Sequence, residues 1–178
     1  MDATGVLLVG GLSRRFGSVK ALAPLGNETL AERGWRLLGE AFPNRMAIGK
    51  ASDQLGLPFP LLDDGIQVRA PLAGIVAGLR ISVTNVAVFL PVDCPLMTPE
   101  ALRSLAEACA DAAVPETGPL PGAYAKTALP LLEARLESGE LALHEALSEL
   151  DVRTVDLDEE LLANVNTERD LDRLRALT

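Results

Sequence analysis

Histidine, cysteine and aromatic residues are scarce in this 178-residue chain. It has one histidine, His144, two cysteines, Cys94 and Cys109, and 3% aromatic residues. A single imidazole excludes a histidine-rich metal site and any catalytic relay that needs two imidazoles. The cysteines lack a Cys-x-x-Cys spacing, so we expect a reduced pair and no disulfide framework. The chemistry must therefore rest on carboxylates, amines, guanidiniums and backbone groups.

Long hydrophobic runs are also missing. Hydrophobic residues make up 48% of the chain, but no run reaches the ~18 residues that would span a bilayer, and no secretory leader precedes them. We expect a cytoplasmic protein with no membrane contact. The length suits a single domain over residues 1–178.

Positive charge is in short supply, and part of it is concentrated. The net charge of −9 argues against nucleic-acid binding, because most of the surface would repel a phosphate backbone. Residues 3–27 nevertheless contain no Asp or Glu, while Arg14, Arg15 and Lys20 fall within them. This basic island is the feature that needs an explanation.

Apolar runs alternate with amphipathic segments along the chain. The patterns predict strands at 4–9, 45–49, 60–62, 86–92, 112–114, 123–125 and 152–155, and helices at 29–41, 71–80, 98–110, 128–138, 143–150 and 167–176. Alternation of this kind predicts an α/β fold, a three-layer α/β/α sandwich with a mostly parallel, Rossmann-like sheet. Ligands of such sheets bind at the carboxyl ends of the strands. The loops 10–20 and 93–97 should both emerge at that edge.

The segment V-G-G-L-S-R-R-F-G-S-V-K, ending at Lys20, follows the first strand. Glycines there allow backbone N–H groups to approach an anion, and Arg15 and Lys20 would complete a phosphate cradle. The dinucleotide fingerprint G-x-G-x-x-G is absent, because Gly10 and Gly11 are adjacent. The P-loop is absent too, because Ala21 stands where the P-loop has Ser or Thr. A surface loop whose cations simply face water is the alternative reading of this segment alone.

Asp93 follows the most hydrophobic strand, in the sequence V-D-C-P-L. A carboxylate at this place is suited to Mg²⁺, which takes one or two carboxylates together with phosphate oxygens of the substrate. A turn or helix-capping role would fit Asp93 equally well on its own. Taken with the phosphate cradle, the acid suggests chemistry on a nucleoside triphosphate.

Four motifs resemble the molybdenum cofactor guanylyltransferase (MobA) family. They are L-V-G-G-L-S-R-R-F-G-S-V-K, A-P-L-A-G-I at 70–75, V-D-C-P-L at 92–96 and N-V-N-T-E-R-D-L at 164–171. The first is similar to a motif shared by sugar and isoprenoid nucleotidyltransferases, and the other three are similar to the molybdopterin branch. The resemblance implies Mg²⁺-dependent transfer of GMP from GTP to molybdopterin with release of pyrophosphate. Molybdoenzymes or their chaperones would be transient partners.

The resemblance also implies roles for individual residues. Gly10 and Gly11 would bring backbone donors to the nucleotide, and Arg15, rather than Arg14, would bind the β and γ phosphates with Lys20. Asp93 would hold Mg²⁺. Leu8, Gly11 and Asp64 match base-binding positions, with Asp63 as an alternative to Asp64, and Gly10 favours guanine because cytidylate-transferring relatives usually have alanine there. Asn164 and Asn166 would contact the acceptor or the metal region, or serve only to shape the chain before a helix.

Three places depart from the family pattern. Val19 replaces the usual aspartate before the lysine, Gly49 and Lys50 replace an asparagine often found after the second strand, and 115–121, which helps to hold the acceptor in relatives, is compressed. Transfer of CMP, another phosphorylated acceptor, a nucleotide-binding protein without turnover and a purely structural domain therefore remain as alternatives.

Overall fold

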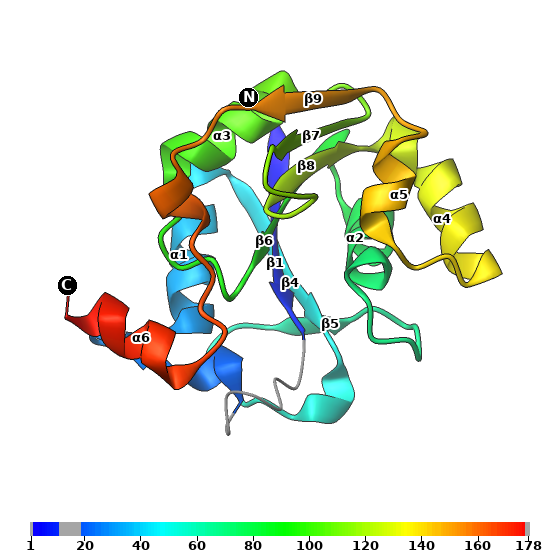
Figure 1. The fold of residues 1–178 in the computed structure, drawn as a ribbon. Helices are drawn as coiled ribbons and strands as arrows, with labels where there is room; N and C mark the ends of the chain where they lie inside the picture. Colours follow the sequence, from blue (N-terminus) through cyan, green and yellow to red (C-terminus); the bar gives the residue numbers. More distant parts are fainter. Residues whose placement is uncertain (1, 11–18, 177–178) are drawn as a thin grey trace.

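A computed structural model describes residues 2–10 and 19–176 and is built around a seven-stranded sheet (Figure 1). The strand order is β5-β4-β1-β6-β8-β7-β9. Only β8 runs against its neighbours, since β6 and β7 both pair with it antiparallel. The strands are β1 (Ala3–Val9), β4 (Asn44–Gly49), β5 (Leu61–Asp63), β6 (Val86–Pro91), β7 (Ala112–Pro115), β8 (Gly122–Ala125) and β9 (Val152–Val155).

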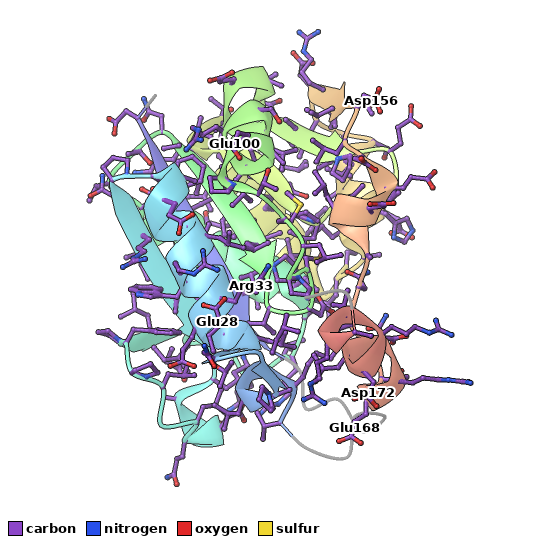
Figure 2. All side chains as sticks on the ribbon, turned by 90° about the vertical axis from the view of Figure 1, so that its left-hand side faces the viewer. Glu28, Arg33, Glu100, Asp156, Glu168 and Asp172 are labelled. Carbon is purple, nitrogen blue, oxygen red and sulfur yellow. The ribbon has the colours of Figure 1, made fainter. Side chains whose placement is uncertain are left out.

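Helices cover both faces of this sheet, as Figure 1 shows. Helices α1 (Leu30–Ala41) and α3 (Pro99–Ala108) pack on one face, and α2 (Pro71–Ile81), α4 (Leu129–Ser138) and α5 (Leu143–Leu147) pack on the other. The expected three-layer sandwich with a mostly parallel sheet is confirmed. Seen from the side of α1 and α3, charged side chains such as Glu100 stand on the outer surface (Figure 2).

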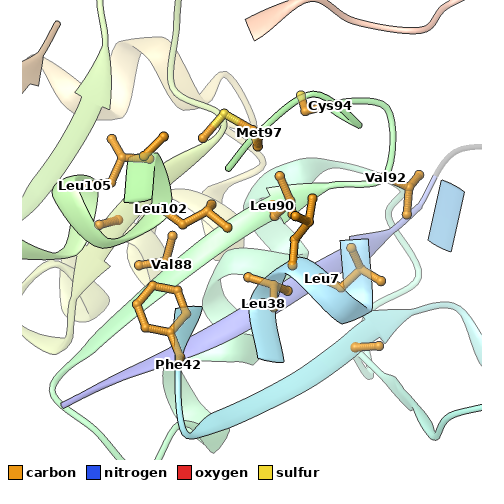
Figure 3. Packing of buried hydrophobic residues seen from close by; sticks show 14 of the residues in the cluster. Leu7, Leu38, Phe42, Val88, Leu90, Val92, Cys94, Met97, Leu102 and Leu105 are labelled. Carbon is orange, nitrogen blue, oxygen red and sulfur yellow. The ribbon is translucent and has the colours of Figure 1, made fainter. Parts of the chain in front are cut away.

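The hydrophobic runs in the sequence correspond to strands buried on both faces. On the α1 and α3 side, Leu7 and Leu90 pack with Leu38 and Leu102 (Figure 3). On the α2 side, a second cluster combines residues of the same two strands, including Phe89, with the helix. Burial of each such side chain contributes roughly 1.5–3 kcal/mol. The two central strands, β1 and β6, are therefore fixed from both sides.

Helix starts follow the capping signals in the sequence. Thr29 accepts a hydrogen bond from the Glu32 N–H and the Glu32 side chain returns one, which completes a capping box on α1. The expected start at Thr98 is also confirmed. Two helix ends fall earlier than predicted: α3 stops at Ala108 because Cys109 is extended, and α5 stops at Leu147, after which the chain continues in turns to Leu150.

A small hairpin and the last helix form a third packing unit, of which the sequence patterns predicted the helix and missed the hairpin. Strands β2 (Pro24–Leu25) and β3 (Glu28–Thr29) flank a turn with Gly26 at a φ of 64°. Helix α6 (Glu168–Arg175) packs on them through Leu25, Leu171 and Leu174. The C-terminal segment is thereby brought beside the chain that follows Lys20. Among the described residues, no helix has the length and apolar character needed to cross a membrane.

The contact between α1 and β1 gives a test of this packing. A Cβ atom at Gly34 would lie 2.5 Å from Cδ1 of the fully buried Leu7. Gly34→Ala should therefore cost about 1–3 kcal/mol in overpacking, which exceeds the roughly 1 kcal/mol that alanine gains in a helix. Urea unfolding should show a lower free energy of unfolding for the variant.

Gly39→Ala on the same helix is the matched control. Its Cβ would meet the guanidinium of the exposed Arg45, which donates to the Trp35 carbonyl oxygen and lies over the Trp35 ring. Displacing these surface contacts costs about as much as the roughly 1 kcal/mol that alanine gains in a helix, so we expect nearly unchanged stability. Equal losses in the two variants would contradict the packing assigned to Gly34.

Candidate active site

A cavity of about 380 Å³ opens at the carboxyl ends of β1, β4, β5 and β6. Its lining includes Leu8, Gly10, Lys20, Asp64 and Asp93, which the sequence analysis singled out. The expectation that the loops after β1 and β6 reach the same edge is confirmed for the described residues. Gly11, Arg14 and Arg15 lie outside the described part of the chain.

Lys20 and Asp93 face each other at one end of this cavity. Lys20 begins the short 3-10 helix η1 (Lys20–Leu22), and its Nζ lies 3.4 Å from Asp93 Oδ2. The same Nζ donates to Asn166 Oδ1 over 3.3 Å. The Lys20 and Asp93 side chains are 11% and 27% exposed. A cation and an acid from segments 73 residues apart therefore share one mouth of the cavity.

The N-V-N-T segment holds the Asp93 loop in place. The Val165 N–H donates to the Asp93 carbonyl oxygen over 2.8 Å, and the Cys94 thiol donates to Asn164 Oδ1 over 3.0 Å. Asn164 also lines the cavity. Both asparagines thus contact residues that line the cavity. These contacts give them a structural role, because they help to hold the cavity wall in place.

Arg33 also holds this loop in place, and the sequence analysis missed it. Its Nε donates to the Pro95 carbonyl oxygen over 2.6 Å, and its Nη1 lies 3.2 Å from Glu28 Oε1. Figure 2 shows Glu28 and Arg33 beside each other at the start of α1. The hydrophobic pattern of that helix predicts core residues and gives no sign of a charged contact to a loop 62 residues away.

Cys94 is a structural thiol. Burial, followed by the negative charge of Asp93, raises the pKa of its thiol far above the usual range, so the thiolate nucleophile does not form near neutral pH. Its side chain packs in the cluster beneath the loop (Figure 3). Both Cys94 and Cys109 are free, as expected.

The two neighbouring acids at the end of β5 have different surroundings. Asp63 accepts hydrogen bonds from the Ala51 and Gly65 N–H groups, each over 2.7 Å, and these hold the pKa of its carboxyl below the usual range. Asp63 is a turn residue outside the cavity. Asp64 lines the cavity and pairs with Lys50 over 2.7 Å. Of the two acids, only Asp64 lines this cavity among the described residues.

Gly49 and Val19, two departures from the family pattern, have packing explanations. A Cβ at Gly49 would lie 2.3 Å from the Val9 carbonyl oxygen, so no side chain fits there. Val19 packs against the hydrophobic core on the α1 face. With no carboxylate at Val19, the acid that Lys20 meets among the described residues is Asp93.

The compressed segment 115–121 is fixed against β8 and reaches the cavity. The Tyr124 hydroxyl donates to the Pro119 carbonyl oxygen over 2.8 Å. A Cβ at Gly122 would lie 2.6 Å from that oxygen, so the close approach requires glycine. Leu120 lines the cavity. This segment therefore supplies an apolar side chain to the cavity wall.

The carboxylates fit a magnesium ion only if a substrate supplies further ligands. Among the described residues, no group of three or more His, Cys, Asp or Glu side chains could hold a metal. Asp93 offers one carboxylate beside a cation. Mg²⁺ commonly binds through one or two carboxylates, waters and substrate phosphates, so the residues fit a metal that arrives with a phosphate ligand. They do not fit a metal cage made by the protein alone.

Comparison with known proteins gives the class of this protein, which is a nucleotidyltransferase. A model of the MobA-like NTP transferase domain matches residues 5–154. The chain therefore belongs to the MobA-like NTP transferase family, as the four motifs suggest. A probable molybdenum cofactor guanylyltransferase from Pelotomaculum thermopropionicum is 31% identical over 192 residues, which cover 99% of this chain and 94% of that protein.

Solved structures of related proteins have the same fold as this chain. Molybdopterin-guanine dinucleotide biosynthesis protein A from Archaeoglobus fulgidus superimposes with a TM-score of 0.83 at 27% identity, over 98% of this chain and 97% of the other. The 2-C-methyl-D-erythritol 4-phosphate cytidylyltransferase from Thermus thermophilus gives 0.70 at 16% identity, over 97% and 96% of the two chains. At that identity the second likeness shows the fold alone.

The Asp63 turn predicts a specific dependence of stability on pH. Because the pKa of Asp63 is lower in the folded chain than its ordinary value of 3.8, its stabilising contribution is complete above that value and is lost as the pH falls through the folded pKa. Asp63→Asn should lower the Tm at pH 7. The difference in Tm between this variant and the parent protein should then become smaller as the pH falls from about 5 to about 2.

Thermal unfolding followed by circular dichroism across this range checks the prediction. Asp156→Asn, at an exposed carboxylate, serves as a control for the loss of one negative charge. A gap for Asp63→Asn that stays constant with pH would rule out the hydrogen-bonded carboxylate as its source.

Proposed function

We propose that this protein transfers GMP from GTP to molybdopterin, releasing pyrophosphate and forming the guanine dinucleotide cofactor. The observation that carries the proposal is the approach of Lys20 to Asp93 at the strand ends that line the cavity. The names of the relatives, which include molybdenum cofactor guanylyltransferases, support the choice of nucleotide and acceptor.

The reaction needs alignment and charge neutralisation rather than a general base. The acceptor is an ionised phosphate monoester, so its oxygen can attack the α-phosphorus of GTP without losing a proton. The bond from the α-phosphorus to the β-bridging oxygen breaks, and pyrophosphate leaves with the electron pair. This chemistry agrees with the position of His144, which is exposed on α5 and does not line the cavity.

The phosphate end of the substrate belongs at Lys20. Its ammonium would bind the β and γ phosphates, with the Gly10 backbone at the turn that follows β1. Arg15 and Gly11, which precede Lys20 in the same motif, are proposed to add a guanidinium and a backbone donor. Neutralising the charge that develops on the leaving pyrophosphate is the main work assigned to these groups.

Asp93 is the proposed magnesium ligand. When bound, Mg²⁺ would neutralise phosphate charge, with Asp93 and phosphate oxygens among its ligands. The contacts of the Val165 N–H, Asn164 and Arg33 all hold the Asp93 loop in place. The acid is therefore fixed before the nucleotide arrives.

The base and the acceptor belong to the other parts of the cavity. Leu8 and Gly11 would contact the guanine, and Asp64 would accept hydrogen bonds from its N1–H and N2–H₂ groups. Leu120 and Asn164 line the part of the cavity proposed for molybdopterin. The product would pass to molybdoenzymes or their chaperones.

Transfer of CMP is the second candidate, because cytidylyltransferases share the fold. The Asp64 carboxylate favours guanine, since cytosine presents a ring-nitrogen acceptor where guanine presents N–H donors. A nucleotide-binding protein without turnover is the third candidate. These readings differ in which triphosphate is consumed and in whether pyrophosphate appears.

Pyrophosphate release with molybdopterin and Mg²⁺ tests the proposal. Labelled GTP should support release of pyrophosphate, and unlabelled ATP, CTP and UTP should compete only weakly with it for the protein. Asp93→Ala should abolish release and keep the circular dichroism spectrum of the parent, because the carboxylate is partly exposed and contributes no core packing. Near-normal turnover of Asp93→Ala would remove the metal assignment, whereas GTP binding without release by the parent would favour the protein without turnover.

Lys20→Ala should reduce turnover less severely than Asp93→Ala. Loss of one charged clamp on a phosphate raises the activation barrier by about 2–4 kcal/mol, or roughly 30-fold to 10³-fold in kcat/KM. Steady-state kinetics with GTP would measure the change. Lys126→Ala, at a lysine that does not line the cavity, is the matched control, and an equal loss in both variants would count against the role of Lys20.

A further inference from the structure

Lys50 is a buried lysine at the edge of the cavity. It follows Gly49 at the end of β4 and is 8% exposed. Its side chain lines the same cavity as Asp64. The four family motifs assign no role to a lysine at this position.

All three N–H bonds of the Lys50 ammonium have acceptors within the protein. Nζ donates to Asp64 Oδ1 over 2.7 Å, to the Val68 carbonyl oxygen over 3.0 Å and to the Ile66 carbonyl oxygen. An ammonium has three donors and no acceptor. Lys50 therefore has no donor left for a nucleotide, and direct binding of a phosphate or base by this group is excluded while these contacts persist.

Among the described residues, only one of the two Asp64 carboxylate oxygens accepts hydrogen bonds. Oδ1 accepts from Lys50 and, over 2.9 Å, from the Ile66 N–H. Oδ2 accepts no hydrogen bond from any described residue. The Asp64 side chain is 6% exposed, and a carboxylate oxygen so placed has two lone pairs available only to something that enters the cavity.

We propose that Lys50 is a positioning residue for base selection, which holds the Asp64 carboxylate with Oδ2 as the single acceptor for the ring N–H and amino donors of guanine. This inference rests on the proposed function, because it assumes that the base of the nucleotide reaches Asp64. Adenine and cytosine present a ring-nitrogen acceptor at the corresponding edge, which a carboxylate oxygen repels.

Lys50 also secures the loop that carries Asp64. Its contacts to the Ile66 and Val68 carbonyl oxygens close residues 64–68 onto the end of β4. Asp64 itself is joined to that strand through its N–H, which donates to the Gly49 carbonyl oxygen over 3.1 Å. Removing the ammonium would release both the carboxylate and the loop. Because Asp64 is proposed to meet the base and not the phosphates, the loss should weaken binding of GTP more than binding of ATP.

Calorimetric titration of GTP and of ATP, each with Mg²⁺, tests the role of Lys50. Lys50→Met keeps the aliphatic stem and removes the donors. We expect the Kd for GTP to rise about tenfold or more, as when a hydrogen bond to a charged group is lost, and the Kd for ATP to change little. Lys50→Arg keeps the charge and should retain part of the preference for GTP. Lys126→Met removes a positive charge outside the cavity and should leave both Kd values unchanged.

The double variant Lys50→Met/Asp64→Asn separates positioning from simple structural support. If Lys50 acts through Asp64, the double variant should show the same ratio of GTP to ATP affinity as Asp64→Asn alone. The Tm of each variant shows whether it is folded. Should Lys50→Met not fold, the ratios for Lys50→Arg and Asp64→Asn carry the test, and a full GTP preference in Asp64→Asn would overturn the inference.

An unchanged ratio of GTP to ATP affinity in Lys50→Met, whether both Kd values rise equally or neither changes, overturns the inference and leaves the proposed function standing. A parent protein that binds GTP and ATP alike also overturns it. The proposed function is judged separately by release of pyrophosphate from GTP with molybdopterin, and it fails only if that release is absent.

Discussion

Parallel pairing between β1 and β6 is the constraint on which the whole site depends. Leu8 lies opposite Pro91 in this ladder, so the chain leaves both strands at the same edge, and the next residues include Gly10 and Asp93. Burial of the two strands on both faces fixes this register, because a slip by one residue would turn core side chains toward the opposite helices. The hydrophobic core thus determines where the acid of the cavity is placed.

The C-terminal part of the chain completes what the strands begin. Helix α6 packs on the β2–β3 hairpin, and the segment before it reaches the Asp93 loop through the Val165 N–H and the Asn166 contact to Lys20. Segments from the N-terminal and C-terminal parts of the chain therefore meet at the cavity. This arrangement explains why the asparagine motif lies far from the other motifs in the sequence and still belongs with them in space.

The fold followed from local signals that agree with one another. Apolar runs marked β1 and β6, and the capping residues Thr29 and Thr98 marked the starts of α1 and α3. Short elements such as the hairpin at Gly26 were missed, because two-residue strands carry no periodicity. The early end of α3 depends on the extended conformation of Cys109, which no residue pattern in that stretch announced.

Within the site, sequence motifs identified residues by type but not by partner. The cavity lining of Leu8, Lys20, Asp64 and Asp93 was accessible from motif resemblance. The contacts of Arg33 and Lys50 were not, because a long side chain can reach partners 62 or 14 residues away that no local pattern specifies. The choice between neighbouring acids likewise required the geometry of the turn that Asp63 closes.

The two lysines of the cavity differ in how firmly they are held, and this difference assigns their work. Lys50 uses all three of its donors in hydrogen bonds within the protein, including one of 2.7 Å to Asp64, and its side chain is therefore held in place. Lys20 has longer contacts of 3.4 and 3.3 Å to two partners among the described residues, so it can exchange them for a phosphate at low cost. Arg69, which also lines the cavity, is occupied by two hydrogen bonds to Asp53. In a chain of net charge −9, Lys20 is thus the cavity cation, within the described residues, that is best suited to meet an incoming polyanion.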